Sequence, residues 1–235
     1  MCEYKIHGKK FIQGDCLEIL PTLENSAHLI VTDPPYNIGW KYSSKVNDNK
    51  KDYDSWCVEW AELCFKALRD KGVLAIINYA ENNNKLFTAL VTKGYNFVQQ
   101  LIWSYPTNVG HSKSKYTRSY RTIIIFSKDK DYRFTPVKQP YKNPTDKRIK
   151  ERIANGHKGT NHYDIFNINL CKNVSKDKKH NGINQLPREL VEMLINTYTE
   201  EFDSVLDPFV GNGTVMDVAD DMARDSVGID INKYD

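Results

Sequence analysis

The sequence predicts a three-layer α/β fold with a mostly parallel sheet, and three observations lead to this prediction. Short apolar runs alternate with stripes of apolar residues at helical spacing, both before residue 104 and after residue 186. The run at 73–77 is apolar at every position, which is typical of a parallel strand buried on both faces. Strands that alternate with helices favour a parallel sheet between two helical layers.

The expected elements follow one another in a regular order. Seven strands are predicted, at 11–13, 28–32, 73–77, 97–103, 122–126, 204–206 and 226–229. One helix is predicted before Gly72 from an apolar stripe of Trp56, Trp60, Leu63, Cys64, Ala67 and Leu68. A second is predicted before Gly94 from Leu86, Phe87, Leu90 and Val91. Two later helices are predicted at 214–223 and after Pro187, the latter with an inward face of Leu190, Val191, Leu194 and Ile195.

Two segments, 105–118 and 128–183, lack this alternation and are polar, basic and rich in Asn, Lys and Pro. We interpret residues 1–235 as a single domain in which these segments are additions. In open α/β sheets ligands bind at the carboxyl ends of the strands. We therefore expect the basic insert to lie near that edge of the sheet.

The distribution of charge supports a basic surface. The whole chain has a formal net charge of only +3, but residues 105–185 hold 18 Lys and Arg against 6 Asp and Glu, a net of +12. The remaining residues have a net charge of −9. Such a split indicates binding of a polyanion, although a solvated Lys-rich loop is the alternative. Nucleic acid is favoured by the aromatic residues among the charges, namely Tyr105, Tyr116, Tyr120, Tyr132, Tyr141 and Tyr163.

Other classes of protein are disfavoured. There is no run of about 18 apolar residues that could span a membrane, and the first residues lack the apolar run of a signal peptide, so a cytosolic protein is predicted. The cysteines are odd in number and lack C-x-x-C spacing; they are Cys2, Cys16, Cys57, Cys64 and Cys171. Neither a disulfide framework nor a metal site is expected from this pattern.

A glycine-bearing turn follows the predicted strand at 204–206 and begins the next helix. It consists of Asp207, Pro208, Phe209, Val210, Gly211, Asn212, Gly213 and Thr214. Glycines allow a tight turn and a close approach of the backbone to a ligand. Asp230 ends the next strand, where dinucleotide folds hold ribose hydroxyls. The phosphate-binding fingerprints G-x-G-x-x-G and G-x-x-x-x-G-K-[ST] are missing, so the turn suits a nucleoside with a cationic part near Asp207, such as S-adenosylmethionine.

A second motif, Asp33-Pro34-Pro35-Tyr36, follows the predicted strand at 28–32. The prolines hold Asp33 and Pro34 extended and make the turn rigid. The Asp33 carboxylate and the Pro34 carbonyl are then two fixed acceptors, and Tyr36 adds an aromatic face. This set suits an exocyclic amine with two N–H donors on a planar ring.

These two motifs resemble those of DNA amino-methyltransferases, and the likeness extends over nearly the whole chain. The motif at 33–36 resembles their catalytic motif, and the turn at 207–214 resembles their cofactor-binding motif, with Asn212 where the family usually has Ser. The catalytic motif comes first and a basic insert separates the two, which is the order of the permuted β group. Gly14-Asp15 resembles that group's acidic residue near the cofactor adenine, and 119–128, 164–166 and 180–190 resemble further segments.

The resemblance implies a Rossmann-like, S-adenosylmethionine-dependent methyltransferase fold, circularly permuted, with a mostly parallel seven-stranded sheet. Residues 128–183 would form the target-recognition insert and 105–118 an additional DNA-facing loop. The implied catalytic residues are Asp33, Pro34, Pro35 and Tyr36. The implied cofactor-binding residues are Asp15, Asp207, Pro208, Phe209, Gly211, Asn212, Gly213, Thr214 and Asp230.

The implied activity is site-specific transfer of a methyl group to the amino group of a flipped adenine, with Tyr36 stacked on the base and Asp33 and Pro34 bound to the amine. Family members that methylate cytosine N4 more often carry Ser in place of Asp33, and relatives that act on RNA or protein amides usually carry Asn there. Adenine N6 is therefore favoured and cytosine N4 is the alternative. A non-catalytic DNA-binding or specificity subunit would not need both motifs intact.

The implied partner is double-stranded DNA, and the candidate contacts are Lys113, Lys115, Arg118 and Arg121. The family also allows a cognate restriction endonuclease as a partner, and either a monomer or a homodimer. A protein of this family is expected in the cytoplasm of a prokaryote, associated with the nucleoid, or encoded by a phage.

Overall fold

The structure is a computed structural model that describes residues 2–6, 8–39, 49–106, 113–171 and 185–232. Its centre is a nine-stranded sheet in the order β1-β2-β11-β10-β3-β4-β6-β5-β9. The strands are β1 (Cys2–Ile6), β2 (Lys9–Gln13), β3 (Ala27–Thr32), β4 (Leu68–Asn78), β5 (Asn96–Ser104), β6 (Tyr120–Ser127), β9 (Ile165–Asn167), β10 (Ser204–Asp207) and β11 (Asp225–Asp230). Of these, β1 and β6 run against the other strands. The mostly parallel sheet is thus confirmed.

The seven predicted strands form the interior of this sheet, and β1 and β9 add an edge strand on either side. Apolar and charged residues alternate in Cys2–Ile6, which is the period of a half-buried β-strand, and this signal was missed. The three residues of β9 are too few to show any period and lie in the segment read as irregular. They pair in parallel with β5 from Ile102 to Ser104.

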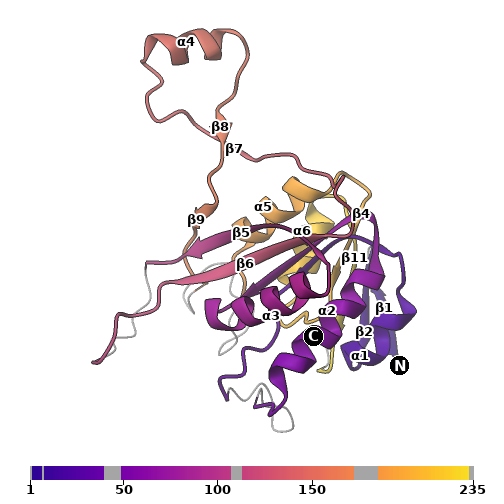
Figure 1. The fold of residues 1–235 in the computed structure, drawn as a ribbon. Helices are drawn as coiled ribbons and strands as arrows, with labels where there is room; N and C mark the ends of the chain where they lie inside the picture. The colour runs from indigo at the N-terminus through magenta and orange to yellow at the C-terminus, as the bar shows by residue number, and fades with distance from the viewer. Residues whose placement is uncertain (1, 7, 40–48, 107–112, 172–184, 233–235) are drawn as a thin grey trace.

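Two helical layers cover the sheet. One core cluster joins it to α1 (Cys16–Ile19), the short 3-10 helix η1 (Leu20–Thr22), α2 (Tyr53–Ala67) and α3 (Ala80–Thr92). The other joins its opposite face to α5 (Arg188–Tyr198) and α6 (Thr214–Asp221). Three layers are therefore present, as predicted (Figure 1). In the part of the chain that the structure describes, no helix combines the length and apolar character needed to cross a membrane.

Two helix ends differ from the prediction. The α2 helix ends at Ala67 rather than near Gly72, because Leu68 is already extended and pairs with Ala27 as the first residue of β4. The α6 helix ends at Asp221 rather than at residue 223, because Ala223 has a φ of 58°, which is outside the helical region. The apolar spacing predicted both helices too long, because the strand or turn residues that follow each helix continue its apolar pattern.

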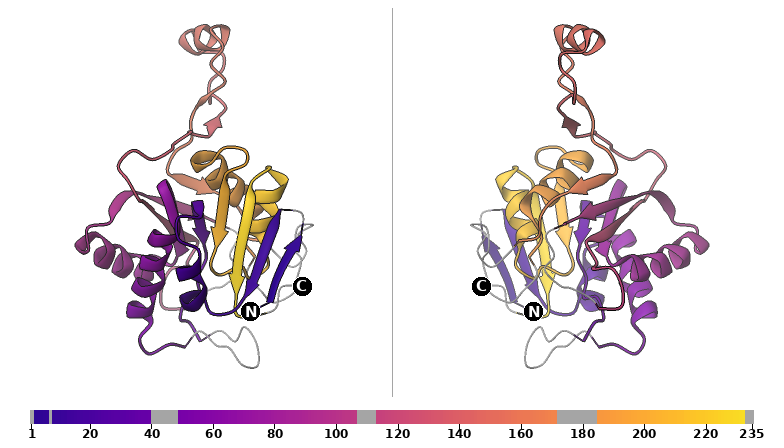
Figure 2. Two further views of the ribbon diagram at one scale, coloured as in Figure 1. Left: turned by 90° about the vertical axis from the view of Figure 1, so that its right-hand side faces the viewer. Right: turned by 90° about the vertical axis from the view of Figure 1, so that its left-hand side faces the viewer.

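The basic insert is more ordered than its sequence indicates. It contains β7 (Lys138–Gln139), α4 (Lys147–Ala154), β8 (Thr160–Asn161) and β9, and β7 and β8 pair antiparallel. Figures 1 and 2 show β7, α4 and β8 carried far from the sheet on two extended chain segments. We call residues 138–161 the arm. No residue of α4 is buried, so the arm contributes nothing to the core.

Close packing of α6 against β11 depends on one glycine. A Cβ atom added to Gly228 would lie 2.3 Å from Met216 Sδ and 2.4 Å from Val210 Cγ2. Both neighbours are buried, and Val210 belongs to the glycine-bearing turn. The absence of a side chain at Gly228 therefore lets the turn and its helix lie directly on the sheet.

Substitution of Gly228 by Ala is expected to destabilise the fold by about 1–3 kcal/mol, because the added methyl group overpacks a full core. Urea denaturation would measure the loss. Ser226→Ala on the same strand is the matched control. The Ser226 hydroxyl is buried without a hydrogen-bond partner within the described residues, so its removal should cost little. Equal stability of the Gly228→Ala variant and the natural protein would contradict this account of the packing.

Candidate active site

Four neighbouring strands carry an acidic residue at their carboxyl ends. Asp33 follows β3, Asp207 ends β10, Asp230 ends β11, and Asp15 lies two residues after β2. These strands are adjacent and parallel in the order β2-β11-β10-β3. The structure therefore brings both sequence motifs and the isolated acidic residues to one edge of the sheet.

The glycine-bearing turn is tied to the end of β11. Gly211 and Gly213 have φ angles of 52° and 75°, in the left-handed region that glycine adopts without strain. The Gly211 N–H donates to Asp230 Oδ2 at 2.9 Å, and the Val210 N–H donates to the Ile229 carbonyl at 3.0 Å. Asp230 therefore fixes the turn. Asp15 caps α1 through the Leu17 N–H at 2.9 Å and remains exposed.

Asp207 lies buried at the start of the turn, as the last residue of β10. Its carboxylate accepts a hydrogen bond of 3.0 Å from the Phe209 N–H. Burial raises the pKa of Asp207 to about 8, although this hydrogen bond opposes the rise, and repulsion from Asp33 and Asp230 adds to it. An anion in such a place is stabilised by a positively charged ligand.

Polar atoms around Asp207 are available to a ligand. Both amide atoms of Asn212 and the Thr214 hydroxyl are buried without a hydrogen-bond partner within the described residues. Buried polar groups normally have partners, so these atoms indicate a site that a polar ligand completes. Pro208 is also buried, and Phe209 adds an apolar wall, with its ring centre 5.5 Å from Trp56 and 5.4 Å from Trp60. A nucleoside with a charged tail fits this mixture of groups.

The loop with Asp33, Pro34, Pro35 and Tyr36 is held by side chains from two helices and a strand. The Tyr53 hydroxyl of α2 donates to the Pro35 carbonyl at 2.6 Å. Asn82 Nδ2 of α3 donates to the Tyr36 carbonyl at 3.0 Å, and Asn78 of β4 donates to the Tyr53 hydroxyl at 3.0 Å.

Sequence reasoning missed these three supporting residues. An Asn at the carboxyl end of β4 was the one available signal, because polar residues at that edge often face the ligand. By contrast, the Pro34 carbonyl accepts no hydrogen bond from the residues that the structure describes.

Asp33 is enclosed by donors. The Tyr36 hydroxyl donates to Asp33 Oδ1, and Arg121 Nη1 lies 3.9 Å from Asp33 Oδ2. Burial raises the pKa of Asp33, and Arg121 and Tyr36 oppose that rise. The Tyr36 ring is only 6% exposed and lies 4.7 Å from the Tyr79 ring, tilted by 50°. In this conformation the ring assigned to base stacking is therefore buried.

The four candidate DNA contacts separate into two groups. Lys113, Lys115 and Arg118 are exposed, and Arg118 pairs with Glu81 and lies 4.0 Å from the Tyr79 ring centre. Arg121 is 4% exposed, because β6 begins at Tyr120 and draws it into the sheet. The prediction that Arg121 lies on the basic surface is therefore wrong. Residues 180–184 and 172–183, which complete the family-like segment and the insert, lie outside the described residues.

Comparison with known proteins agrees with this geometry. A family model described as DNA methylase matches residues 27–234, which include both motifs. The chain belongs to this DNA methylase family. Type II methyltransferase M.HpaI of Haemophilus parainfluenzae is 30% identical over 96% of this chain and 71% of its own. Type II methyltransferase M1.MboII of Moraxella bovis is 31% identical over 95% and 92%. DNA adenine methyltransferase YhdJ of Escherichia coli is 28% identical over 96% and 79%.

Solved structures show the same fold for this methyltransferase. The cytosine-N4-specific PvuII DNA methyltransferase aligns with a TM-score of 0.72 over 95% of this chain and 82% of its own, at 19% identity. M1.HpyAVI in complex with S-adenosylmethionine aligns with a TM-score of 0.62 over 96% and 94%, also at 19% identity. The methyltransferase therefore has a Rossmann-like fold and belongs to the DNA methylase family of N6-adenine and N4-cytosine enzymes.

Proposed function

We propose that this methyltransferase acts on N6 of adenine in double-stranded DNA. The observation that carries the proposal is the Asp33 carboxylate, which stands beside the cofactor-binding turn with the Pro34 carbonyl as a second acceptor. The motif has Asp33 where family members that methylate cytosine N4 more often carry Ser, and this favours adenine. The relative YhdJ is also named an adenine methyltransferase. Cytosine N4 is the second candidate, and the structural likeness to the PvuII enzyme is consistent with it.

The residues at the site would act on the target amine as acceptors. When bound, S-adenosylmethionine supplies an electrophilic methyl group to the site. Asp33 and the Pro34 carbonyl would accept hydrogen bonds from the two amine hydrogens and orient the nitrogen lone pair. The amine would replace the Tyr36 hydroxyl at Asp33 Oδ1. Positive charge would develop on the nitrogen as its bond to the methyl carbon forms and the bond from that carbon to the cofactor sulfur breaks. The Asp33 carboxylate would stabilise this charge until the proton passes to water.

The proposed cofactor contacts differ in chemistry, and each kind would bind a different part of the cofactor. Asp207 would face the cationic part, the orphaned atoms of Asn212 and Thr214 would complete its hydrogen bonds, and Asp230 would accept from ribose hydroxyls. Phe209 would cover an apolar face, with Pro208, Gly211 and Gly213 shaping the backbone, and Asp15 would lie at the adenine end.

An assay of methyl transfer to unmethylated genomic DNA tests the proposal. Labelled DNA would be hydrolysed and the methylated bases separated. Label in N6-methyladenine is expected. Label only in N4-methylcytosine would overturn the adenine assignment and leave the methyltransferase assignment intact.

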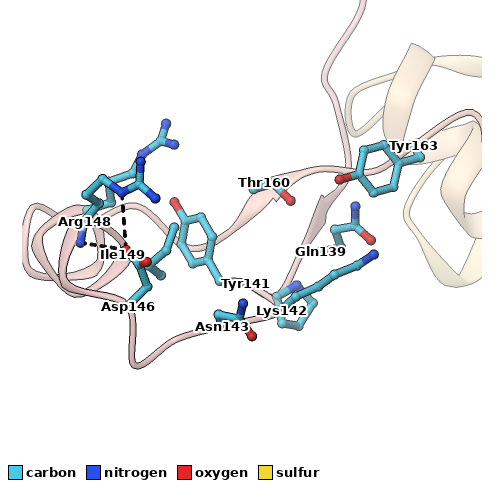
Figure 3. A pocket seen from close by; sticks show the side chains of 11 residues that line it. Gln139, Tyr141, Lys142, Asn143, Asp146, Arg148, Ile149, Thr160 and Tyr163 are labelled. Carbon is cyan, nitrogen blue, oxygen red and sulfur yellow. Dashed lines mark hydrogen bonds and ion pairs between the residues drawn. The ribbon is translucent and has the colours of Figure 1, made fainter.

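Two exposed basic surfaces are available for DNA. One is the segment 113–118, which leads into the first strand residue of β6, and its Arg118 lies 4.0 Å from the ring centre of Tyr79. The other is the arm, where α4 carries Lys147, Arg148, Lys150 and Arg152 on its exposed surface. A hollow of about 400 Å³ is lined by Tyr141 and Arg148 of the arm and by Tyr163, two residues beyond it (Figure 3). We infer that both surfaces contact phosphates.

DNA affinity is therefore expected to depend steeply on salt. Each neutralised phosphate contributes about −0.9 to the slope of log affinity against log salt, so five contacts give a slope of about −4 to −5. Replacing Lys113, Lys115 and Arg118 with Ala should flatten the slope by about two to three units, since Arg118 already pairs with Glu81. Binding measured at several salt concentrations would decide this. If the DNA affinity of the natural protein did not depend on salt, the basic insert would be excluded as the main DNA-binding surface. If the triple variant kept the natural slope, the phosphate contacts would be assigned to the arm instead.

A further inference from the structure

Arg121 has a buried guanidinium group among four aromatic rings. It is the second residue of β6 and pairs across the sheet with Trp103 of β5. The guanidinium carbon lies 4.8, 5.1, 5.7 and 5.8 Å from four ring centres, those of Tyr36, Trp103, Tyr79 and Tyr105, respectively. A cation within about 6 Å of a ring face is attracted to it electrostatically. These rings therefore form a box that holds the guanidinium.

The open side of this box faces the catalytic carboxylate. Arg121 Nη1 lies 3.9 Å from Asp33 Oδ2, and the other carboxylate oxygen accepts from the Tyr36 hydroxyl. The Arg121 side chain is 5% exposed, and its Nε is buried without a hydrogen-bond partner within the described residues. Burying a charge in this way costs free energy that only good partners offset. A cation retained at this cost beside Asp33 indicates a role in the reaction.

The charges around Asp33 show what this role is. Arg121 faces it from β6, Tyr36 from its own loop and Asp207 from β10, while Tyr79 and Tyr105 stand behind the guanidinium. Asp33 and Asp207 repel each other. Burial raises the pKa of Asp33, and Arg121 is the larger of the two influences that oppose it. Loss of the cation would leave two neighbouring acids with no counter-charge from β6.

We propose that Arg121 is a positioning residue for methyl transfer, which acts through Asp33 and Tyr36 and does not contact DNA. Its charge favours the carboxylate form that accepts the target amine. Its planar head lies against the Tyr36 ring and sets the direction from which the hydroxyl meets Asp33. This inference rests on the proposed role of Asp33 and adds a residue that neither motif contains.

Two variants separate charge from shape. Arg121→Gln keeps a planar head and removes the charge, whereas Arg121→Lys keeps the charge and removes the planar head. The measurements are kcat and KM for DNA between pH 5 and 10. Arg69→Gln is the matched control, because Arg69 is exposed and lies near the opposite end of β4.

In Arg121→Gln, the acid limb of kcat should move to higher pH by about one unit or more, the size of shift that an opposite charge at this distance produces. Because Asp33 is still ionised above this limb, kcat should recover towards the natural value there, with KM for DNA within about threefold. Arg121→Lys should keep the natural acid limb and lower kcat at every pH. A uniform fall of kcat in Arg121→Gln with an unmoved limb would overturn the proposal, and so would a change confined to KM.

A stability cycle tests the pairing without reference to activity. Asp33→Asn, Arg121→Gln and the double variant would be compared by thermal unfolding. Each single change leaves one buried charge unpaired, so the fall in Tm of the double variant should be smaller than the sum of the single falls. If the falls in Tm are additive, or if removal of Asp33 does not recover any stability lost in Arg121→Gln, Asp33 is not the partner of Arg121. A coupled pair with unchanged turnover in Asp33→Asn would instead contradict the proposed function alone.

Discussion

Substitution of Asp33 by Asn is expected to lower kcat by about a hundredfold to a thousandfold, the cost of removing one group aimed at the developing charge of a transition state. Affinity for S-adenosylmethionine should change little, because the proposed cofactor contacts lie on the turn after β10 and at the ends of β2 and β11. A loss confined to kcat identifies an interaction that is made in the transition state.

Single-turnover methylation and calorimetry with the cofactor would measure the two quantities. Asp70→Asn makes the same change at an exposed position near the amino end of β4 and should leave both unchanged. Near-normal turnover in Asp33→Asn would remove Asp33 from the mechanism. A parallel loss of cofactor affinity would instead place it in the cofactor site.

The second large effect is expected for Asp207→Asn, which should weaken cofactor binding by about thirtyfold or more, as truncation of a buried charged partner does. The same variant should not lose stability without cofactor. The pKa of Asp207 is raised to about 8 by burial, while an unfolded Asp ionises near 3.9. Folding at neutral pH therefore takes up a proton, and the carboxyl group destabilises the fold increasingly as pH rises from about 4 to 8.

The upward shift of the Asp207 pKa predicts two pH profiles. The advantage of Asp207→Asn in Tm should be largest near pH 8 and vanish near pH 4. The affinity of the natural protein for the cationic cofactor should increase with pH and level off above about 8, where Asp207 is ionised. Calorimetry and thermal unfolding across this range would measure both. A variant that binds the cofactor normally would place the cationic part elsewhere. A variant that is less stable than the natural protein at pH 8 would contradict the raised pKa of Asp207.

The sequence was sufficient for the parts of the site that follow strands. Asp33 and Asp207 each end an apolar run, and parallel strands bring their carboxyl ends to one edge whatever the strand order. The glycine pattern at 211 and 213 likewise predicted a tight turn before a helix. These signals are local, and the resemblance to the family rests on the same residues.

Features that depend on tertiary contacts were not predictable in this way. Tyr53 and Asn82 hold the loop at 33–36 from the first turns of two helices, and their neighbours in sequence show no sign of it. Arg121 lies close to a basic loop in sequence and was grouped with it. The β6 strand begins at Tyr120, two residues before the predicted start at 122, and this places Arg121 inside the sheet, which a composition count cannot detect. In α4, Ile149 and Ile153 at helical spacing were the one sign of order in the arm, and a single pair is weak evidence.

The most direct test of the account is the methylation pattern in DNA of a host that expresses the protein. Single-molecule sequencing of that DNA would be compared with DNA from cells that carry the Asp33→Asn variant. N6-methyladenine at one short recurring sequence, present with the natural protein and absent with the variant, is the predicted result. N4-methylcytosine in its place, or no methylated base at all, would contradict the account.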